Sequence, residues 1–267
     1  MRDLTMELKN ILAKLRKADH HYHMIEEGDR IAVGVSGGKD SMVLLTALHW
    51  YSKFKDKHFE VVGIHIEMGF PDMDFTAVRQ YCAKYGIAYE DCPSNLYAIL
   101  RQYPGKDGKI QCSRCSALKK GAVIKEAKKR GCNKVAFGHH GDDAVETLFL
   151  NMMYGGKLAT FEPSMYLTRE AITFIRPLIY CFEEEITHAL RTNDIPFVAS
   201  TCEKEGITKR TDMKRFLQML YQHDPLAKEN LLLALHNEEQ VKLWHKDPTF
   251  ENNKRAFHAA RAQLKQK

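Results

Sequence analysis

Short apolar runs alternate with amphipathic stretches along most of the chain. Residues 31–35 form one apolar run, and residues 40–51 follow it with apolar side chains three and four positions apart, as one face of a helix requires. The further runs that predict strands are 60–66, a strand that begins at 87–89, 134–137, 173–175, and a last strand or extended piece at 195–198. The further stretches that predict helices are about 75–85, about 116–130, 142–154 and 182–191. This alternation indicates an α/β fold, a parallel sheet with helices on both faces.

Two stretches lie outside this alternation. Residues 93–111 carry two prolines and two glycines and predict a loop. After the last alternating element, the apolar spacing in 213–220 predicts an amphipathic helix and 226–236 predicts another. We therefore expect an α/β domain over residues 1–200, which carries the functional site, and a helical C-terminal extension over residues 201–267.

The composition is ordinary for a globular protein. Of 267 residues, 44% are hydrophobic and 28% are charged. No apolar run approaches the roughly 18 residues that a membrane helix needs, so we expect no membrane partner. Residues 1–17 mix charged with apolar side chains and lack the apolar core of a secretory signal. We expect a cytoplasmic protein.

The charge balance is modestly basic. Lys and Arg number 40 and Asp and Glu number 34, which gives a formal charge of +6. An excess of this size is compatible with a polyanionic partner such as RNA but does not require one.

A glycine-rich string joins the first predicted strand to the first predicted helix. It consists of Ser36, Gly37, Gly38, Lys39, Asp40 and Ser41. The glycines let the backbone approach an anion closely, and the amides at the start of the helix point toward it. The lysine adds a positive charge and the serines add donors, whereas the aspartate is suited to orient Mg²⁺ or to cap the helix. The string predicts a phosphate site, although a turn that binds nothing is the alternative, and it lacks the spacing of a Walker loop.

A second polar string follows the strand predicted at 134–137. Its members are Gly138, His139, His140, Gly141, Asp142 and Asp143. Ligands of parallel sheets bind at the carboxyl ends of the strands, so both strings are expected at one edge. A carboxylate here can help to hold magnesium or act as a base. The alternative is that Asp142 and Asp143 only cap a helix, and one residue can do both.

Two of the seven cysteines have the spacing of metal ligands. The seven are Cys82, Cys92, Cys112, Cys115, Cys132, Cys181 and Cys202. Their odd number and a reducing compartment argue against a disulfide framework. Only two residues separate Cys112 from Cys115, so their thiolates can bind one metal ion or one cluster. A lone pair of this kind leaves a zinc site, a redox pair and chance spacing open.

These strings together resemble one known family. The stretch 111–121 is similar to the Cys-Ser-x-Cys-Ser-x-Leu-(Arg/Lys)-(Arg/Lys)-Gly segment of tRNA 2-thiocytidine synthetases, also called tRNA-cytidine 32 2-sulfurtransferases. The stretches 148–157 and 175–181 resemble the same family. The glycine-rich string resembles the phosphate loop of its superfamily, the PP-loop ATP pyrophosphatases. The likeness extends over about residues 29–200.

The resemblance implies a PP-loop ATPase fold and a reaction with ATP and Mg²⁺. Members of the family adenylate the 2-oxygen of a tRNA cytidine, in the anticodon loop at position 32, and replace that oxygen by sulfur. The resemblance assigns ATP binding to the glycine-rich string, Gly138 and His139. It assigns catalytic roles to Asp142 and Asp143. It also implies tRNA as substrate, a cysteine desulfurase or sulfide as sulfur donor, and a homodimer.

The resemblance further implies a 4Fe–4S cluster held by three cysteines, whose open fourth iron binds sulfide. Cys112 and Cys115 match two ligands, and Cys202 is the candidate for the third. The family usually has a second Cys-x-x-Cys close to that position, whereas this chain has one cysteine there. Lys119, four residues after Cys115, is expected on the same helix face, where its charge can stabilise the transition state. Related thiolases have a lysine at this spacing, and the alternative for Lys119 is a solvated basic face.

Basic side chains form three groups that are candidates for contacts with RNA phosphates. The groups are Lys119, Lys120, Lys125, Lys128, Lys129 and Arg130; Lys204, Lys209, Arg210, Lys214 and Arg215; and Lys254, Arg255, Arg261, Lys265 and Lys267. Each group can equally be a solvated face. The aromatic side chains of Tyr97, Tyr103 and Phe161 lie in predicted loops and are candidates for stacking on a flipped base.

Other functions stay open on the sequence alone. The same chemistry can act on another tRNA base, such as a uridine, or on a small molecule. Thiolases of T-loop uridines commonly carry cysteine-rich zinc modules at both ends, and this chain has no cysteine before Cys82 or after Cys202. Lysidine synthetase shares the Gly-His-His-x-Asp-Asp string but has no use for Cys112 and Cys115. A function of another class is a non-catalytic iron–sulfur or zinc protein that binds RNA or senses redox state.

Overall fold

The computed structural model describes residues 4–70, 73–105, 110–199 and 209–243. The chain forms two compact units, Met1–Leu232 and Leu233–Lys267, and the site lies in the first. The domain boundary expected after residue 200 stays a prediction. Across the described residues, no helix is long and apolar enough to span a bilayer.

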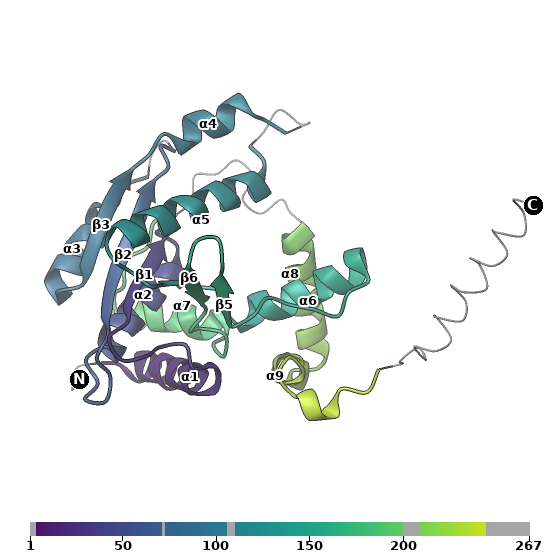
Figure 1. Cartoon of the computed structure of the whole chain (residues 1–267). Coiled ribbons are helices and arrows are strands. Elements are labelled where there is room, and N and C mark those ends of the chain that lie inside the picture. The colour runs from purple at the N-terminus through teal and green to yellow at the C-terminus, as the bar shows by residue number, and fades with distance from the viewer. Residues whose placement is uncertain (1–3, 71–72, 106–109, 200–208, 244–267) are drawn as a thin grey trace, which may run out of the picture. The chain divides into compact units, whose positions relative to one another are not determined.

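A six-stranded sheet forms the centre of the first unit (Figure 1). Its strands are β1 (Arg30–Val35), β2 (Glu60–Glu67), β3 (Ala88–Pro93), β4 (Lys134–Ala136), β5 (Ser164–Leu167) and β6 (Ile172–Ile175). The strand order is β3-β2-β1-β4-β6-β5, and every neighbouring pair is parallel except β5–β6. The predicted parallel α/β sheet is therefore confirmed, with one antiparallel edge strand, β5, that the sequence did not reveal.

The described helices agree with the predicted ones except in three places. They are α1 (Met6–Tyr22), α2 (Lys39–Tyr51), α3 (Thr76–Tyr85), α4 (Leu96–Gln102), α5 (Cys112–Lys129), α6 (Gly141–Gly155), α7 (Glu183–Thr192), α8 (Lys209–His223), α9 (Leu226–Ala234) and a short 3₁₀ helix, Glu238–Gln240. The sequence did not identify α1, and α4 occupies part of the stretch predicted as a loop. The helix α5 begins four residues earlier than predicted, because the backbone of Gln111 is extended and its carbonyl accepts a 2.9 Å hydrogen bond from the Cys115 amide.

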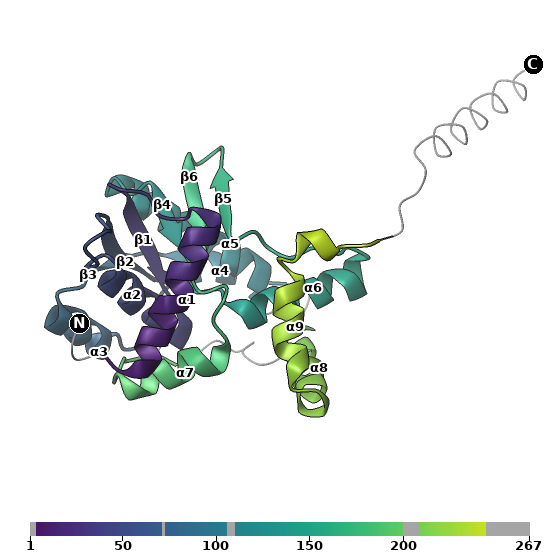
Figure 2. The same ribbon diagram turned by 90° about the horizontal axis from the view of Figure 1, so that it is seen from below.

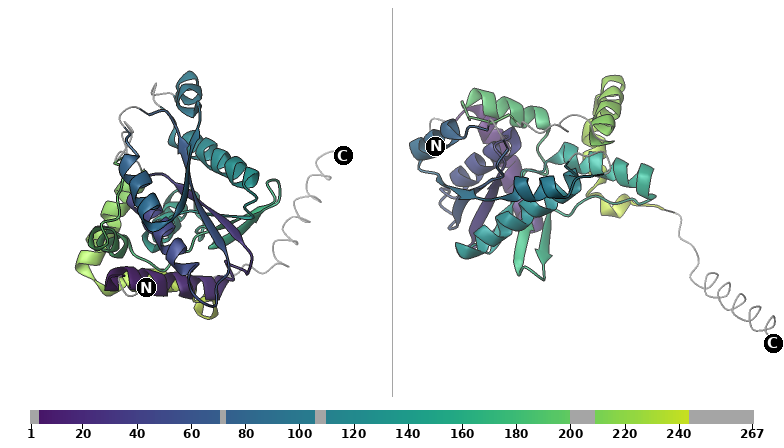
Figure 3. Two further views of the ribbon diagram at one scale, coloured as in Figure 1. Left: turned by 90° about the vertical axis from the view of Figure 1, so that its left-hand side faces the viewer. Right: turned by 90° about the horizontal axis from the view of Figure 1, so that it is seen from above.

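Helices cover both faces of the sheet, as predicted. One apolar core lies between the sheet and α1, α2, α3 and α7, and its centre includes the fully buried Leu44 and Leu45 of α2. A second core lies on the other face, under α4 and α5, where Val123 and Ala127 of α5 are buried. Figures 2 and 3 show this layering, with the sheet between α1 and α5. Two buried faces fix the sheet rigidly and leave the loops at its edge to form the site.

The segment 195–199 forms neither a helix nor a strand of the sheet. The amide of Val198 donates a 2.9 Å hydrogen bond to the carbonyl of Gly37. The strand predicted at 195–198 is therefore absent, whereas the extended piece stays a prediction, and the segment lies against the glycine-rich string.

Candidate functional site

The glycine-rich string forms a tight loop between β1 and α2. Gly37 has a φ of +86°, and a Cβ there would lie 2.8 Å from the ring of Phe75, so only glycine fits without strain. The two serines close the loop: their Oγ atoms are 3.1 Å apart, and Ser41 Oγ donates to the carbonyl of Gly38 at 2.8 Å. The loop therefore leads into the N-terminus of α2, where backbone amides and the helix dipole favour an anion.

The second polar string lies against this loop. A Cβ on Gly138 would lie 2.8 Å from the backbone carbonyl carbon of Asp40, so the two loops approach as closely as a glycine permits. They follow β1 and β4, which are adjacent parallel strands. The chain leaves β1 toward β2 on one side and reaches β4 on the other, so the site lies at the point where the strand order reverses.

Lys39 is held by two carboxylates. Its Nζ lies 2.9 Å from Glu183 Oε1 and 3.2 Å from Asp40 Oδ1. Burial by itself lowers the pKa of Lys39, but these two carboxylates outweigh it and leave the pKa raised. Glu183, in the first turn of α7, also forms an ion pair with Lys214 of α8. Lys39 is therefore a fixed positive charge at the phosphate loop.

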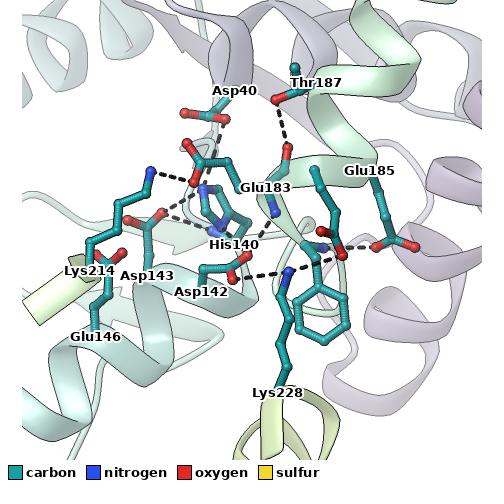
Figure 4. Close-up of polar contacts among 12 residues, drawn as sticks. Asp40, His140, Asp142, Asp143, Glu146, Glu183, Glu185, Thr187, Lys214 and Lys228 are labelled. Carbon is teal, nitrogen blue, oxygen red and sulfur yellow. Dashed lines mark hydrogen bonds and ion pairs between the residues drawn. The ribbon is translucent and has the colours of Figure 1, made fainter. Parts of the chain in front are cut away.

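A buried histidine lies among three carboxylates (Figure 4). The ring nitrogens of His140 are 3.9 Å from Asp40, 3.4 Å from Asp142 and 3.5 Å from Asp143. Burial alone lowers the pKa of His140, whereas its hydrogen bond with Asp142 and the charges around it raise it overall. The backbone amide of His140 also donates to Asp143 Oδ2 at 3.1 Å, which caps α6. Asp143 thus has the helix-capping contact that the sequence offered as an alternative, and its carboxylate also lines a cavity.

The helix α8 supplies two cations to this acidic group. Arg210 Nη1 lies 2.8 Å from Asp143 Oδ1, and Lys214 is paired with Glu183. On the other side, Asp142 Oδ2 accepts a 2.7 Å hydrogen bond from the Glu183 amide. Figure 4 shows Lys214 and Lys228 beside these carboxylates. Two residues that were candidates for RNA contacts, Arg210 and Lys214, are therefore engaged inside the site.

A large cavity of about 960 Å³ opens beside the phosphate loop. Residues 65–70, at the end of β2 and just after it, form one wall, and Val198 and Ala199 lie on another. Part of the phosphate loop also lines it, namely Ser36, Gly38, Lys39 and Asp40. The size and the mixed apolar and polar lining suit a nucleotide whose phosphates lie at the loop.

A smaller cavity of about 270 Å³ lies on the other side of the phosphate loop. Its lining residues come from the phosphate loop, from α5 and from the second string, and they include Ser116, Lys119, Lys120, Phe137, His139 and Asp143. Three residues, Ser36, Asp40 and Lys119, line both cavities. The two spaces therefore meet at these side chains.

Lys119 and the cysteines share α5. Cys112 is exposed and Cys115 is half-buried. Both lie in the first turn of the helix, and Ser116, the next residue, lines the smaller cavity. Burial lowers the pKa of Lys119, and the negative charge of the Cys115 thiolate acts against that shift. The helix thus connects the thiols with the meeting point of the cavities.

The structure brings most of the expected residues into one site. The phosphate loop except Gly37 lines the cavities together with Gly138, His139, Asp143 and Lys119, and Asp142 Oδ2 lies 3.4 Å from His140 Nδ1. Cys202 lies outside the described residues, as do Lys204 and the basic residues after 243. Sequence reasoning missed Glu183 and the wall at 65–70. The three consecutive glutamates at the start of the helix predicted at 182–191 were a signal for an acidic helix N-terminus, but nothing in the sequence paired Glu183 with Lys39.

The residues present fit the groups that the fold implies. Asp40 Oδ1 is buried, forms the ion pair with Lys39 and accepts no hydrogen bond from the described residues, so it can also serve as an oxygen ligand for a hard cation such as Mg²⁺. The thiols of Cys112 and Cys115 are the soft donors that iron–sulfur clusters use. Among the described residues, no group of three or more His, Cys, Asp and Glu has the arrangement of a complete metal site.

Comparison with known proteins gives consistent results. Residues 4–219 match the family described as a PP-loop domain. The chain is 37% identical over 226 residues to the tRNA-cytidine(32) 2-sulfurtransferase of Geotalea uraniireducens, covering 84% of this chain and 89% of that protein. It is 38% identical over 231 residues to the enzyme of the same name from Geobacter sulfurreducens, with coverage of 86% and 90%.

A solved structure shares the fold. The U34-tRNA thiolase NcsA from Methanococcus maripaludis, determined with its 4Fe–4S cluster, superposes with a TM-score of 0.70 at 20% identity, covering 90% of this chain and 81% of that one. At this identity the likeness shows the fold alone. The family match and the relatives show more: the chain belongs to the PP-loop ATP-binding family and, within it, to the tRNA-cytidine(32) 2-sulfurtransferases, which are enzymes that modify tRNA.

Proposed function

We propose that this protein replaces the 2-oxygen of cytidine 32 in tRNA by sulfur, in a reaction driven by ATP. The observation that carries the proposal is the meeting of two cavities at Ser36, Asp40 and Lys119. One cavity has the size and position for ATP, and the other lies between the phosphate loop and the thiol-bearing helix α5. Relatives named tRNA-cytidine(32) 2-sulfurtransferase supply the substrate and the position.

The chemistry follows in two displacements. The 2-oxygen of cytidine attacks the α-phosphorus of ATP, a phosphorus–oxygen bond forms, and the bond to pyrophosphate breaks. A carbon–sulfur bond then forms at C2, the carbon–oxygen bond breaks, and AMP leaves with the original oxygen. Sulfur enters as hydrosulfide, whose proton passes to a base or to water, so no electron transfer is needed.

The residues of the chain stabilise the charges that these steps create. The amides of the phosphate loop and Lys39 bind the β and γ phosphates that leave as pyrophosphate. Lys119, at the meeting point, is placed to neutralise charge on the α-phosphate and the 2-oxygen. Asp40 and Asp143 are the carboxylates that line the smaller cavity, and Asp143 is the candidate base.

Two groups that the family implies would be held by residues of this site. Asp40 would bind Mg²⁺, which screens the phosphates. Cys112, Cys115 and Cys202 would bind a 4Fe–4S cluster, with Cys202 outside the described residues. When bound, a cluster with three protein thiolates supplies an iron with an open coordination position that can hold sulfide.

The test is the nucleoside that the protein makes. Anaerobically reconstituted protein is incubated with unmodified tRNA, ATP, Mg²⁺ and sulfide, and the digested nucleosides are analysed by mass spectrometry. We expect 2-thiocytidine, with one AMP and one pyrophosphate formed for each sulfur incorporated. Formation of 2-thiouridine, or cleavage of ATP without any thionucleoside, would contradict the proposal.

A further inference from the structure

The smaller cavity has a wall that the larger cavity does not share. It is formed by Lys120 of α5 with Phe137 and His139 after β4. The Lys120 ammonium lies 6.0 Å from the centre of the Phe137 ring, and the rings of Phe137 and His139 are 6.1 Å apart. This wall therefore combines one positive charge with two aromatic rings, whose planes are inclined by 74° to each other.

Most cations of the site are paired with carboxylates. Lys39 is paired with Glu183 and Asp40, and Lys228 lies 3.0 Å from Glu184. Arg210 and Lys214 are paired with carboxylates as well. The protein thus neutralises its own positive charge on the side of α7 and α8.

Lys120 differs from these cations. Across the part of the chain that the structure describes, it forms no ion pair with a carboxylate. It is half-buried, and burial followed by the positive charges of Arg176 and Arg210 lowers its pKa. Its ammonium is therefore kept in a positive field from which part of the solvent is excluded.

Arg176 adds a second positive charge near Lys120. Its side chain is buried with 6% exposure, and its guanidinium carbon lies 5.0 Å above the centre of the Phe161 ring. Its Nη1 donates to the carbonyl of Glu162, whereas its Nε is buried and, within the described residues, has no hydrogen-bond acceptor. The ring of Phe161 is 5.3 Å from that of His139, so Arg176 stands behind the aromatic wall.

Desolvated cations without a counter-charge are costly, and an anionic ligand removes that cost. A phosphate is the anion that a lysine ammonium commonly binds. It has two sources here, the phosphates of ATP and the backbone of the RNA. The loop between Ser36 and Ser41 lines both cavities, but its lysine, Lys39, lines only the larger one, whereas Lys120 lines only the smaller one. We therefore assign the phosphates of ATP to Lys39 and the larger cavity. Aromatic faces beside a phosphate site are typical of sites for an unstacked nucleotide.

We propose that Lys120, with Arg176 behind it, binds the phosphodiester of the tRNA nucleotide whose base enters the smaller cavity. The inference rests on the proposed function, because it takes tRNA as the acceptor. It assigns to Lys120 a role in substrate binding that is separate from the role of Lys119 at the meeting point. Phe137 and His139 form the wall along which the base lies.

The test is the salt dependence of tRNA binding to the reconstituted protein without ATP. Lys120→Met removes the charge and keeps the aliphatic stem, and Lys125→Met, an exposed position of the same helix, is the matched control. Removing one phosphate contact lowers the slope of log K against log salt by about 0.7 for single-stranded RNA. We expect that loss in Lys120→Met, restoration in Lys120→Arg, no change in Lys125→Met, and unchanged affinity for ATP.

Three results would overturn the inference. An unchanged slope in Lys120→Met excludes the RNA phosphate. A loss of ATP affinity in this variant with an unchanged slope assigns Lys120 to the phosphates of ATP. An equal loss in Lys125→Met shows a diffuse basic surface. Because binding is measured without turnover, failure of wild-type protein to form 2-thiocytidine contradicts the proposed function separately.

Discussion

Lys39 Nζ lies 2.9 Å from Glu183 Oε1, so that the phosphate-loop lysine is paired with a carboxylate from α7. The two residues are far apart in the sequence and come from different helices. We expect a phosphate bound at the loop to compete with Glu183 for this ammonium. Nucleotide binding should then weaken this pair and leave Glu183 with its second partner, Lys214.

We expect Glu183→Gln to bind ATP more tightly than the wild type, because the substitution removes both the competitor for Lys39 and a negative charge near the phosphates. The change should be about threefold to tenfold in Kd, and the melting temperature should fall because Lys39 and Lys214 lose their shared partner. Calorimetric titration and thermal denaturation measure the two effects. Glu184→Gln, at an exposed carboxylate of the same helix turn, is the control. Weaker ATP binding in Glu183→Gln would show that Glu183 positions Lys39 instead.

We expect Lys39→Ala to weaken ATP binding by about tenfold or more, because a charge-assisted contact to a phosphate is lost. Its affinity for tRNA should stay close to that of the wild type. Equilibrium binding of each ligand distinguishes the two effects. Unchanged ATP affinity would place the phosphates elsewhere.

Gly138→Ala tests the close approach of the two loops. The new Cβ would lie 2.8 Å from the backbone of Asp40, so we expect loss of ATP-dependent activity and a destabilisation of about 1–3 kcal/mol. Gly121→Ala, in the interior of α5, meets no atom within 4 Å and should stabilise the protein by about 0.5–1 kcal/mol. Urea denaturation measures both. Equal stability of the two variants would contradict the close contact between Gly138 and the backbone of Asp40.

Glu146 should make stability depend on pH. Burial, followed by the charge of Asp143, raises its pKa to about 7 from the ordinary 4.5. Because the folded-state pKa is the higher one, the folded protein binds the proton more tightly, and this contribution to stability is lost as the pH rises from about 4.5 to 7. In the presence of a chelator, Glu146→Gln should therefore gain stability relative to the wild type over this range, on the order of 1–3 kcal/mol. A difference that does not vary with pH would show that Glu146 titrates normally.

We expect Cys112→Ala to lose iron and thiolation but to keep ATP affinity, because the thiol lies on α5 and does not line the larger cavity. Cys202→Ala should behave in the same way if Cys202 is the third ligand. The control variant Cys132→Ala replaces a buried cysteine before β4 and should retain the iron content of the wild-type protein. Iron and acid-labile sulfide analysis after anaerobic reconstitution measures the content. Normal thiolation by Cys112→Ala would remove the cluster from the mechanism.

The sequence revealed the elements whose signals are local. The β1 and α2 pattern and the tight glycine loop between these elements depend on neighbours within a few residues, and both lie where they were predicted. The helix α1 was missed although Leu8, Ile11 and Leu15, three and four positions apart, line its buried face. The start of α5 was misplaced because Cys112 and Ser113 carry no apolar periodicity.

The pairings of the site needed the three-dimensional structure. Glu183 reaches Lys39, and Arg210 reaches Asp143, across long stretches of chain. No sequence periodicity or motif indicates which carboxylate forms an ion pair with which cation, because these pairs depend on how α7 and α8 pack beside the sheet. The same is true of residues 65–70, whose role as a cavity wall follows only from the order of the strands.

The most direct test of the central claim is the fate of the cytidine oxygen. A tRNA labelled with ¹⁸O at C2 of its cytidines is thiolated by the reconstituted protein, and the AMP is analysed by mass spectrometry. If the protein adenylates the base as proposed, each AMP that accompanies a 2-thiocytidine carries one ¹⁸O on its phosphate. Unlabelled AMP, formed together with 2-thiocytidine, would show that ATP activates something other than the cytidine oxygen.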